Sequence, residues 1–556
     1  MGQAKLKERV SRPDGEARND ERMTGSRTLM QRLASRQSNE IVIAFAGPVG
    51  CGLDGVVEAT ERSLIDHGYA VVRLKLGACL EAALEAGHVI VESPPGSEEF
   101  ARRRRLQMAA LRMREASDDV HLLAEYAVER VLAERSRAPL SDRAPVAVPG
   151  RTAYLLDQLK RPEEVDLLRT LYRNLFYLVG VTRSYAHRLR TLLDLNMRRE
   201  EAESLMAIDR QESSDFGQRL ERTLQLADVF VRNEVDADPL LTLRRFIRLL
   251  HGDSAISPTC EEIGMYAAYA ASLKSACLSR QVGAAIANDR GEILATGCND
   301  VPAQGGGVHP RQGVGDQRCL HMKTHLCHND RSKHQLLREI GAVLRRALPV
   351  VANGVPQAAM DSAMDAIYSQ TRLGYLIEFS RAVHAEMDAI LTMARTCTPG
   401  LLGSTMFTTT FPCHSCARHV VAAGISRVVY IEPYEKSLAQ ALHNDSIRFE
   451  AMPESADTAD AEGVGTKAED RVSFEHFEGI APRLFPVAFR SGTRKARRSG
   501  RWIPIREDAA SKVLPEYMDN YTDFEAAAST HFHSAYRSAC GGSAPETLRA
   551  IPGEKT

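Results

Sequence analysis

The sequence predicts a protein built from two α/β domains, and three observations support this prediction. The chain has 556 residues, which is enough for two large domains. A continuous apolar run at Ile41–Ala46 is followed directly by glycines and a helical stretch, as expected for a buried parallel strand that leads into a helix. A second series of strands and helices follows residues 253–258, which we interpret as the boundary between the domains.

Composition excludes several classes of protein. Lys and Arg number 71 and Asp and Glu number 72, so the net charge of -1 excludes a globally basic nucleic-acid coat protein and an acidic disordered chain. No apolar run approaches the ~18–20 residues of a membrane span, and the N-terminus lacks the apolar core of a secretory signal. The 11 cysteines are scattered and odd in number, which fits a reducing compartment. We therefore expect a cytoplasmic protein with no membrane partner.

The first domain is predicted over residues 39–252, after a polar and mobile arm at 1–38. Its opening pattern of strand, glycine loop, helix and strand is typical of a nucleotide-binding α/β fold. The elements expected after Ile41–Ala46 are a helix at 56–67, a strand at 69–74, helical residues at 100–136, strands at Thr152–Asp157 and 175–181, and helices at 185–205 and 218–250 with a short strand at 228–231.

The second domain is predicted over residues 258–490, followed by a C-terminal extension at 491–556. An alanine-rich helix at 261–278 precedes two strands, 282–287 and 293–297, which the turn at 289–291 joins as a hairpin. The other expected elements are helices at 333–348, at 381–395 and from Ser415, strands at 404–410 and 427–431, and an exposed acidic loop at 453–470.

His384, Cys413 and Cys416 form a set with the composition of a catalytic zinc site. Cys413 and Cys416 make the only C-x-x-C of the chain, and they follow a predicted strand at a helix start, where the helix dipole lowers the pKa of a thiol. Three protein ligands leave the fourth position of Zn²⁺ open for water, whereas structural zinc sites usually close with four. Taken alone, this C-x-x-C would equally fit a redox or structural pair.

Glu386 completes the chemistry that this set predicts. It lies two residues after His384, where it can face the same cavity without binding the metal and can move a proton from water to a ring nitrogen and to leaving ammonia. The combination of H-x-E with P-C-x-x-C is the signature of zinc-dependent nucleobase deaminases. The sequence therefore predicts hydrolytic deamination, with Zn²⁺ held by His384, Cys413 and Cys416 and with Glu386 as general acid and base.

Further segments resemble the deoxycytidylate deaminase family: S-R-Q-V-G-A-A-I at 279–286, G-C-N-D-V-P at 297–302 and V-H-A-E-M-D-A-I at 383–390. The resemblance implies a cytidine-deaminase-like α/β/α domain, a deoxycytidine nucleotide as substrate, and substrate contacts from Asn299, Ala385 and Pro412, with Asn299 bonded to the sugar. Without the resemblance, Asn299 also fits a plain turn residue. Cys298 and Asp388 depart from the family pattern, in which an aromatic residue and Asn are common.

A second group of metal-binding residue types lies within residues 319–334. Its members are Cys319, His321, His325, Cys327, His328 and His334. Some deoxycytidylate deaminases hold an additional structural zinc, but these spacings match no standard zinc finger. The sequence leaves two interpretations open, a second metal site and a polar insertion near the mouth of the active site.

The glycine loop after the first strand has the context of a P-loop, in which backbone N–H groups wrap a phosphate. Leu53 replaces the lysine of that motif and Asp54 replaces its Mg²⁺-binding Ser or Thr. We therefore expect a degenerate P-loop that binds a regulatory nucleotide, with Mg²⁺ as a companion ion, and does not transfer phosphate efficiently. A tight glycine turn without a ligand is the alternative. The residues expected to bind the nucleotide are Gly47, Val49, Gly50, Cys51, Gly52 and Asp54.

This loop and the segments 157–165, 168–172, 216–218, 227–230 and 477–483 resemble a larger architecture. They are similar to the bacterial anti-phage dCTP/dCMP deaminases, in which a nucleotide-kinase-like P-loop domain is fused ahead of the deaminase. The resemblance covers about residues 40–490. It implies removal of cellular dCTP or dCMP during phage infection, inhibition by a small RNA, and assembly into homo-oligomers.

Two other functions stay open at this point. A zinc deaminase acting on cytosine or adenine in RNA or DNA would share the chemistry but would need an open groove for a flipped base. The basic runs at 102–105 and 494–498 could contact RNA, yet they lack interleaved aromatic residues and are more simply solvated faces. The second alternative is a regulatory nucleotide- or RNA-binding protein with a vestigial deaminase, against which the complete set with Glu386 argues.

Overall fold

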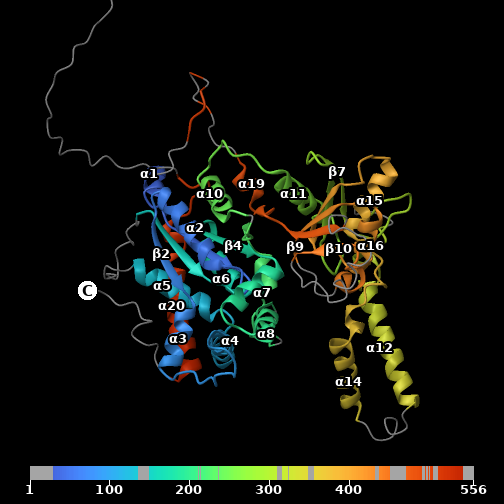
Figure 1. The fold of residues 1–556 in the computed structure, drawn as a ribbon, viewed down its shortest axis with the longest axis horizontal. Helices are drawn as coiled ribbons and strands as arrows, with labels where there is room; N and C mark the ends of the chain where they lie inside the picture. The colour runs from blue at the N-terminus through green and yellow to red at the C-terminus, as the bar shows by residue number, and fades with distance from the viewer. Residues whose placement is uncertain are drawn as a thin grey trace, which may run out of the picture.

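Two β-sheets, each covered by helices, form the two halves of the molecule in the computed structural model (Figure 1). The predicted acidic loop at 453–470 and residues 1–28 of the predicted arm lie outside the described residues, and the arm's remaining part includes the short helix α1 (Leu29–Ala34). In the part of the chain that the structure describes, no helix has the length and apolar character needed to cross a membrane. The described residues are 29–135, 150–210, 212, 214–235, 237–309, 316–323, 325–347, 356–432, 437–450, 471–490, 495, 499, 501–504 and 511–541.

The first sheet has the strand order β12-β5-β4-β1-β3-β2. β1 lies in its middle and is fully buried, as the apolar run predicted. Neighbouring residues of β1 pack into different cores, Ile43 on one face of the sheet and Val42 on the other. All pairings are parallel except that of β12 with β5. The strands are β1 (Ile41–Ala46), β2 (Ala70–Lys75), β3 (Thr152–Asp157), β4 (Phe176–Thr182), β5 (Val229–Arg232) and β12 (Gly479–Ile480).

Helices cover both faces of the first sheet. On one face lie α2 (Leu53–Asp66) and α10 (Pro239–Leu250). On the other lie α3 (Gly77–Glu85), α4 (Glu98–Ser117), α5 (Leu122–Arg135), α6 (Pro162–Tyr172) and α20 (Thr522–Cys540). The remaining helices of this half are α7 (Tyr185–Asp194), α8 (Arg199–Arg210) and α9 (Leu220–Leu224). The stretch predicted as helical at 185–205 forms two helices, which are separated where Asn196 adopts a left-handed φ of 61°.

The second sheet has the order β10-β11-β9-β8-β6-β7. β6 and β7 form the predicted antiparallel hairpin, and β8, β9, β11 and β10 run parallel to one another. Helix α11 (Cys260–Ser272) covers one face, and α15 (Ala385–Thr396), α16 (His414–Ala422) and α17 (Ala439–His443) cover the other. The strands are β6 (Gly283–Ala287), β7 (Ile293–Cys298), β8 (Thr405–Thr410), β9 (Arg427–Glu432), β10 (Ile447–Phe449) and β11 (Val472–His476).

Two glycines allow helices to lie unusually close to this sheet. A Cβ atom on Gly283 would lie 1.9 Å from the backbone oxygen of Ala268 on α11. A Cβ atom on Gly297 would lie 2.3 Å from the backbone oxygen of Ala385 on α15. Any side chain at these positions would displace the helix. The position of α15 relative to the sheet is therefore closely fixed. The first turn of α15 carries candidate site residues.

The C-terminal part of the chain returns to the first half of the molecule. β12 follows β11 after two residues and pairs with β5 of the first sheet. Farther along, after the short helix α19 (Phe485–Ala488), α20 packs against α5 and α4. The segment predicted as the second domain, 258–490, thus supplies one strand to the first sheet, and the predicted extension, 491–556, supplies a helix to the first half.

A pair of helices, α12 (His328–Ala347) and α14 (Gln357–Gln370), projects from the second half of the molecule (Figure 1). The two helices contact each other where Gly341 of α12 meets Met364 of α14. The helix predicted at 333–348 is therefore present but begins five residues earlier. Its first residues lie at the base of the projection, next to the candidate site described below.

Candidate active site

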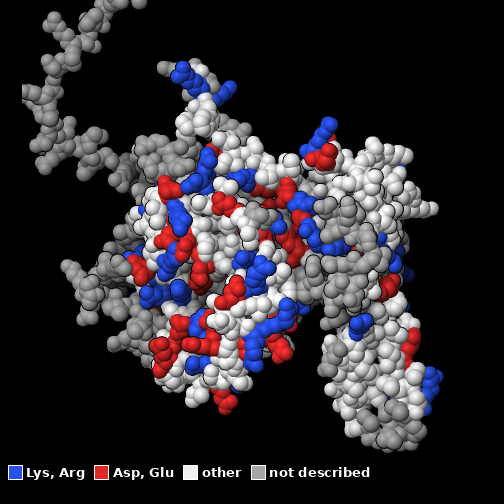
Figure 2. Space-filling view, viewed as in Figure 1, with Lys and Arg blue, Asp and Glu red and all other residues white. Residues whose placement is uncertain are grey.

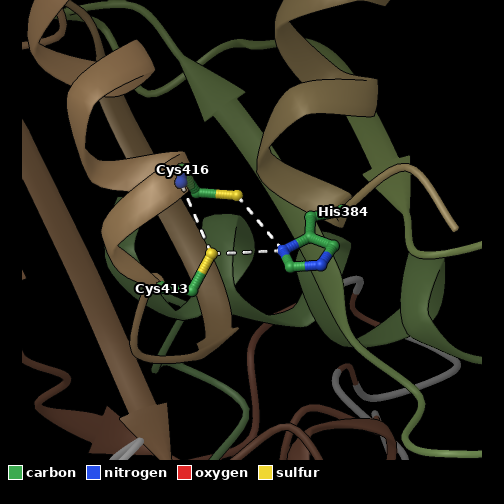
Figure 3. Close-up of side chains that lie close together, drawn as sticks. All are labelled: His384, Cys413 and Cys416. Carbon is green, nitrogen blue, oxygen red and sulfur yellow. Dashed lines mark hydrogen bonds between the residues drawn. The ribbon is translucent and has the colours of Figure 1, made fainter. Parts of the chain in front are cut away.

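Three metal-ligating side chains converge just beyond the carboxyl end of β8 (Figure 3). The Nδ1 atom of His384 lies 3.3 Å from the Sγ atom of Cys413 and 3.4 Å from that of Cys416. All three ligand atoms lie within 4.8 Å of one another. Tetrahedral zinc with bonds of about 2.0–2.3 Å needs ligand atoms about 3.3–3.8 Å apart, so the set has dimensions that fit this ion.

Two helix starts place these side chains. His384 is the N-cap residue of α15 and Cys413 that of α16, both with extended backbone. The N–H group of Cys416 donates to Cys413 Sγ at 3.4 Å, so a sulfur atom takes the role that an oxygen usually has in capping. The positive end of the α16 dipole faces this sulfur and favours its thiolate form.

Contacts within the set shift its pKa values. Hydrogen bonds from Cys416 and His384 lower the pKa of the Cys413 thiol to about 4. The hydrogen bond with Cys413 raises the pKa of His384 to about 9. The contact with Cys413, followed by burial, raises the pKa of the Cys416 thiol above its ordinary value. The protein thus stabilises negative charge on one sulfur atom at the point where a cation would bind.

Glu386 lies in the first turn of α15 and is 4% exposed. It forms part of the same cavity wall as His384 and Cys413. Burial, reinforced by the nearby Cys413, raises the pKa of its carboxyl group. A raised pKa makes a carboxyl group a better proton acceptor, which suits a group that moves protons.

A cavity of about 300 Å³ opens in front of the set. Its volume falls at the lower end of the range of small-molecule sites. The predicted residues Asn299 and Ala385 contribute to its wall, together with Phe411 and with two cationic residues, Arg280 and Lys333. The cavity therefore combines metal-ligating side chains with two cationic side chains and the carboxyl groups of Asp330 and Glu386.

Pro412 does not contribute to this wall, although the residues on either side of it do. Its carbonyl oxygen instead accepts a hydrogen bond of 2.9 Å from the Ser437 hydroxyl. The structure therefore places Pro412 in the loop that positions Cys413, and its contact with substrate stays a prediction.

Asn299 is 8% exposed and its side chain holds the loop before β6. Its Oδ1 atom accepts from the N–H group of Val282 at 2.7 Å, and its Nδ2 atom donates to the carbonyl of Arg280 at 2.7 Å. Asp388, one of the two departures from the family pattern, is also buried and accepts from the N–H group of Cys298 at 3.1 Å. Both side chains therefore fix the end of β7 and the cavity wall through backbone contacts.

Sequence reasoning missed two groups near the site. The first is buried Asp300, which accepts from the N–H group of Ala276 at 3.1 Å and lies 3.4 Å from the guanidinium of Arg318. The second is the base of the projecting helices, where Lys333 lines the cavity and lies 3.0 Å from the carboxylate of Asp330. The polar residues after residue 328 were the only sign in the sequence that this segment lies near the site. Lys333 reaches the cavity through the tertiary arrangement of the chain, which has no local pattern.

Comparison with known proteins identifies the family of this site. Residues 258–432 match the family model of the cytidine and deoxycytidylate deaminase zinc-binding region. Deoxycytidylate deaminase of Enterobacteria phage T4 is 30% identical over 173 residues, which are 31% of this chain and 76% of the relative. That of phage T2 is 30% identical over 174 residues, which are 31% of this chain and 78% of the relative.

The chain belongs to the deoxycytidylate deaminase family. Among solved structures, the dCMP deaminase of the cyanophage S-TIM5 in apo form aligns with 40% of this chain and 99% of its own, at 18% identity and a TM-score of 0.19. The family match covers the residues from α11 to the end of β9, which include all four residues predicted for the chemistry. It does not reach the first sheet.

The six Cys and His residues at 319–334, outside the deaminase set, do not converge on one point. Among the residues that the structure describes, only two groups of ligand atoms could hold a metal, and neither includes this cluster. Its members point to separate partners: His321 to Asp316, His325 to the carbonyl of Leu320, and His334 to the ring of Tyr368. The structure therefore favours the polar insertion over the second metal site.

The glycine loop of the first half lines a larger cavity of about 630 Å³. Five of the six residues predicted to bind a nucleotide contribute to the wall, and Gly47 does not. The loop is fixed by the protein's own side chains: Asp209 accepts from the N–H group of Val49 at 2.7 Å, and Lys160 donates to the carbonyl of Gly47 at 3.2 Å. Lys160 and Asp209 lie 2.6 Å apart, so one ion pair occupies the mouth of the loop.

The basic run at 102–105 is largely neutralised by neighbouring carboxylates. Arg102 and Arg103 both contact Glu99, and Arg104 lies 3.6 Å from Glu212. Figure 2 shows acidic and basic side chains intermingled on the visible face of this half, without a field of one sign. This arrangement agrees with a solvated face. In the second run, at 494–498, only Lys495 lies within the described residues.

Proposed function

We propose that this chain deaminates a free deoxycytidine nucleotide by hydrolysis, with His384, Cys413 and Cys416 holding Zn²⁺ and Glu386 moving the proton. The observation that carries the proposal is the convergence of three zinc-type ligand atoms within 4.8 Å, next to the buried Glu386, in one cavity. Membership of the deoxycytidylate deaminase family supports it.

The reaction replaces the amino group at C4 of cytosine by the oxygen of water and releases ammonia. When bound, Zn²⁺ would lower the pKa of a water molecule to about 7, so that the nucleophile forms at neutral pH. Glu386 accepts the proton that this water loses and donates it to the ring nitrogen beside C4. The same carboxylate then takes the remaining proton from the new hydroxyl group at C4 and passes it to the amino group. The bond between C4 and nitrogen breaks as the C4 carbonyl forms, and ammonia leaves.

Two cationic side chains on the cavity wall, Arg280 and Lys333, are our candidates for binding the phosphate of a nucleotide. On binding, the phosphate would compete with the carboxylates that they now face, Glu432 at 3.6 Å and Asp330 at 3.0 Å. Lys333 is supplied by α12 at the base of the projecting helices, so this part of the fold belongs to substrate recognition in our proposal. The deoxycytidylate deaminases of phages T4 and T2 are named for the monophosphate, and we extend this substrate class to the triphosphate of the same nucleoside.

Three substrates separate this proposal from its rivals. Purified protein is incubated with dCMP, dCTP and a cytosine-containing oligonucleotide, and ammonia release is measured. We expect release with at least one free nucleotide and none with the oligonucleotide. Release from the oligonucleotide alone would establish a polynucleotide deaminase, and no release from any of the three in zinc-loaded protein would support the vestigial alternative.

We propose further that the enzyme depletes dCTP as a defence against phage and is held inactive by a small RNA until infection. Resemblance of the motifs to anti-phage dCTP/dCMP deaminases motivates this role. Nucleotide pools of infected cells that carry the wild type or the Glu386→Gln variant test it: dCTP should fall only with the wild type. Co-purifying RNA and the molar mass in solution test the small-RNA inhibitor and the homo-oligomer.

A third proposal concerns the glycine loop, which we assign to a regulatory nucleotide without kinase activity. Leu53 leaves the loop without its usual lysine, but Lys160 from the end of β3 brings an ammonium group to the same place. Binding would require the phosphate to replace the carboxylate of Asp209 at the N–H group of Val49. Mg²⁺ would then accompany the nucleotide next to Asp54.

Two measurements test this regulatory site. We expect no transfer of the γ-phosphate of labelled ATP to dCMP. We also expect Lys160→Met to weaken nucleotide binding, with Arg62→Met, an exposed change on α2, as the matched control. Robust phosphate transfer, or identical nucleotide binding in the two variants, would contradict the proposal.

A further inference from the structure

A second group of potential metal ligands lies where α20 meets the start of α5, and its members are distant in sequence from the deaminase residues. Asp119 precedes α5, Glu125 lies in its first turn, and His531 reaches them from α20. One ligand atom from each lies within 4.8 Å of the others. The His531 Nδ1 atom is 2.8 Å from a carboxylate oxygen of Glu125 and 3.9 Å from Oδ2 of Asp119.

One oxygen atom of this group lacks a hydrogen-bond partner. The Oδ1 atom of Asp119 accepts from the N–H group of His121 at 2.8 Å, but Oδ2 accepts no hydrogen bond although it is buried. The Asp119 side chain is 9% exposed. An unsatisfied buried carboxylate oxygen is costly unless a cation completes its environment.

The two ends of the α5–α20 contact neutralise their carboxylates differently. At one end, Arg135 on α5 forms ion pairs with Glu525 of α20 and with Glu40, so a permanent cation lies between two acids. At the other end, within the described part of the chain, the ion-pair partners of Asp119 and Glu125 are His121 and His531. Imidazole nitrogen atoms and carboxylates can both bind a divalent metal ion, whereas a guanidinium cannot. Of the two ends, this one therefore offers a cation donor atoms of both kinds.

We propose that Asp119, Glu125 and His531 form a binding site for a divalent transition-metal ion, Zn²⁺ being the probe of choice. The donor set of one imidazole and two carboxylates suits Zn²⁺, Mn²⁺ or Fe²⁺ better than a thiol-seeking ion. A tetrahedral ion needs ligand atoms about 3.4 Å apart. This distance lies between the 2.8 Å from His531 Nδ1 to Glu125 and the 3.9 Å from His531 Nδ1 to Asp119. His121, whose Nδ1 atom is 3.3 Å from Asp119 Oδ1, lies beside the group and is not part of it. The 61% exposure of His531 leaves a path for the ion to enter.

The consequence is structural. The ion joins α20 to α5, so that the C-terminal helix is held on the first half of the molecule by metal at one end and by Arg135 at the other. The deaminase residues lie in the other half of the molecule, so the two metal sites are independent of each other. Binding at this site therefore does not depend on the proposed function.

Zinc content of the full-length protein tests the site. Stripped protein is dialysed against Zn²⁺, and bound metal is counted in the wild type, His531→Leu, Asp119→Asn and His533→Leu. His533 is the matched control, because it lies on the same helix and pairs with Glu129 outside the group. Cys416→Ala is included to mark the deaminase site.

We expect the Cys416→Ala protein to bind one ion. Adding His531→Leu or Asp119→Asn to this protein should remove the ion, whereas adding His533→Leu should leave it bound. We also expect Zn²⁺ to raise the melting temperature of the Cys416→Ala protein and of its His533→Leu form, and not of the other two. Retention of the ion in both test variants would overturn the site. Loss of the ion with His533→Leu as well would indicate displacement of α20 and would equally overturn it, as would a Cys416→Ala protein that binds no ion.

Discussion

At the scale of single residues, neighbouring acids of α15 serve different purposes. Glu386 faces the cavity beside the metal-ligating set, whereas Asp388, two residues later, accepts from the N–H group of Cys298 and fixes β7. Successive positions on a helix lie about 100° apart, so two residues of one acidic turn can have unrelated surroundings. These surroundings make Glu386 the proton carrier of our proposal and give Asp388 a structural contact.

The first prediction is that Glu386→Gln abolishes deamination while Zn²⁺ stays bound. The amide keeps the shape of the side chain but cannot move a proton, and a general acid–base group is typically worth ~10²–10⁴-fold in rate. Turnover of dCMP or dCTP and zinc content are measured on the same preparation. Activity within tenfold of wild type would remove Glu386 from the mechanism.

The second prediction concerns Cys416→Ala, which should lose both metal at the deaminase site and activity. Three protein ligands are the minimum for an open catalytic site, so the loss in affinity should exceed the ~10–100-fold that a change outside the ligand set causes. Cys397→Ser, an exposed cysteine at the end of α15, is the control and should behave as wild type. Zinc bound with wild-type affinity in Cys416→Ala would mean that another residue completes the set.

At the scale of secondary-structure elements, the site depends on how closely α15 packs on β7. His384 and Glu386 belong to the start of α15, and this start lies directly over Gly297. His384 lies at the start of α15, and both cysteines lie at the start of α16. A small shift of α15 therefore changes the distance from His384 to both cysteines. Packing of backbone on backbone leaves no flexible side chain to absorb such a shift.

The third prediction is therefore that Gly297→Ala weakens zinc binding and destabilises the protein. The new methyl group would lie 2.3 Å from the carbonyl oxygen of Ala385, and overpacking of this kind typically costs ~1–3 kcal/mol. Denaturant melts and zinc titration measure both effects. Gly55→Ala on α2, whose new methyl group meets nothing within 4 Å, is the control and should be neutral or slightly stabilising. Equal behaviour of the two variants would contradict the close-packing argument.

At the scale of the whole molecule, segments from the end of the chain complete the first half. Lys512 is buried and donates to the carbonyl oxygen of Glu40, just before β1. Glu262 of α11 accepts from the N–H group of Ile480 at 2.8 Å and contacts Arg245 of α10. The contacts of Lys512 with Glu40 and of Ile480 with Glu262 join residues more than 200 positions apart. The two halves and the C-terminal segment therefore form parts of one structure.

The fourth prediction is a pH dependence from Lys512. Burial lowers the pKa of its ammonium group from 10.5 to about 7 in the folded protein. Between pH 7 and 10 the unfolded chain therefore binds more protons at this residue, so its contribution to the free energy of unfolding rises with pH. The stability of the wild type relative to Lys512→Met should increase by up to a few kcal/mol over this range. Denaturant melts at pH 7, 8.5 and 10 measure it, and a constant or falling difference would contradict the burial of a titrating Lys512.

The sequence by itself determined which residues could form the metal-ligating set that the structure brings together. A metal set needs particular donor atoms, and the types and spacing of His384, Glu386, Cys413 and Cys416 leave few alternatives, because C-x-x-C at a helix start places two sulfur atoms on one turn. The buried strand at Ile41–Ala46 and the hairpin of β6 and β7 could also be predicted, since burial and alternation are local patterns.

Only the tertiary structure decided which other residues surround that chemistry. Lys333 reaches the cavity from the projecting helices, Asn299 turns to the backbone of Arg280 and Val282, and Pro412 stays outside the wall. The return of β12 and α20 to the first half, and with it the meeting of Asp119, Glu125 and His531, had no local signal. Contacts between residues hundreds of positions apart depend on how the helices and strands are arranged in space. Hydrophobic periodicity predicts which face of a helix or strand is buried, but not which other element packs against that face.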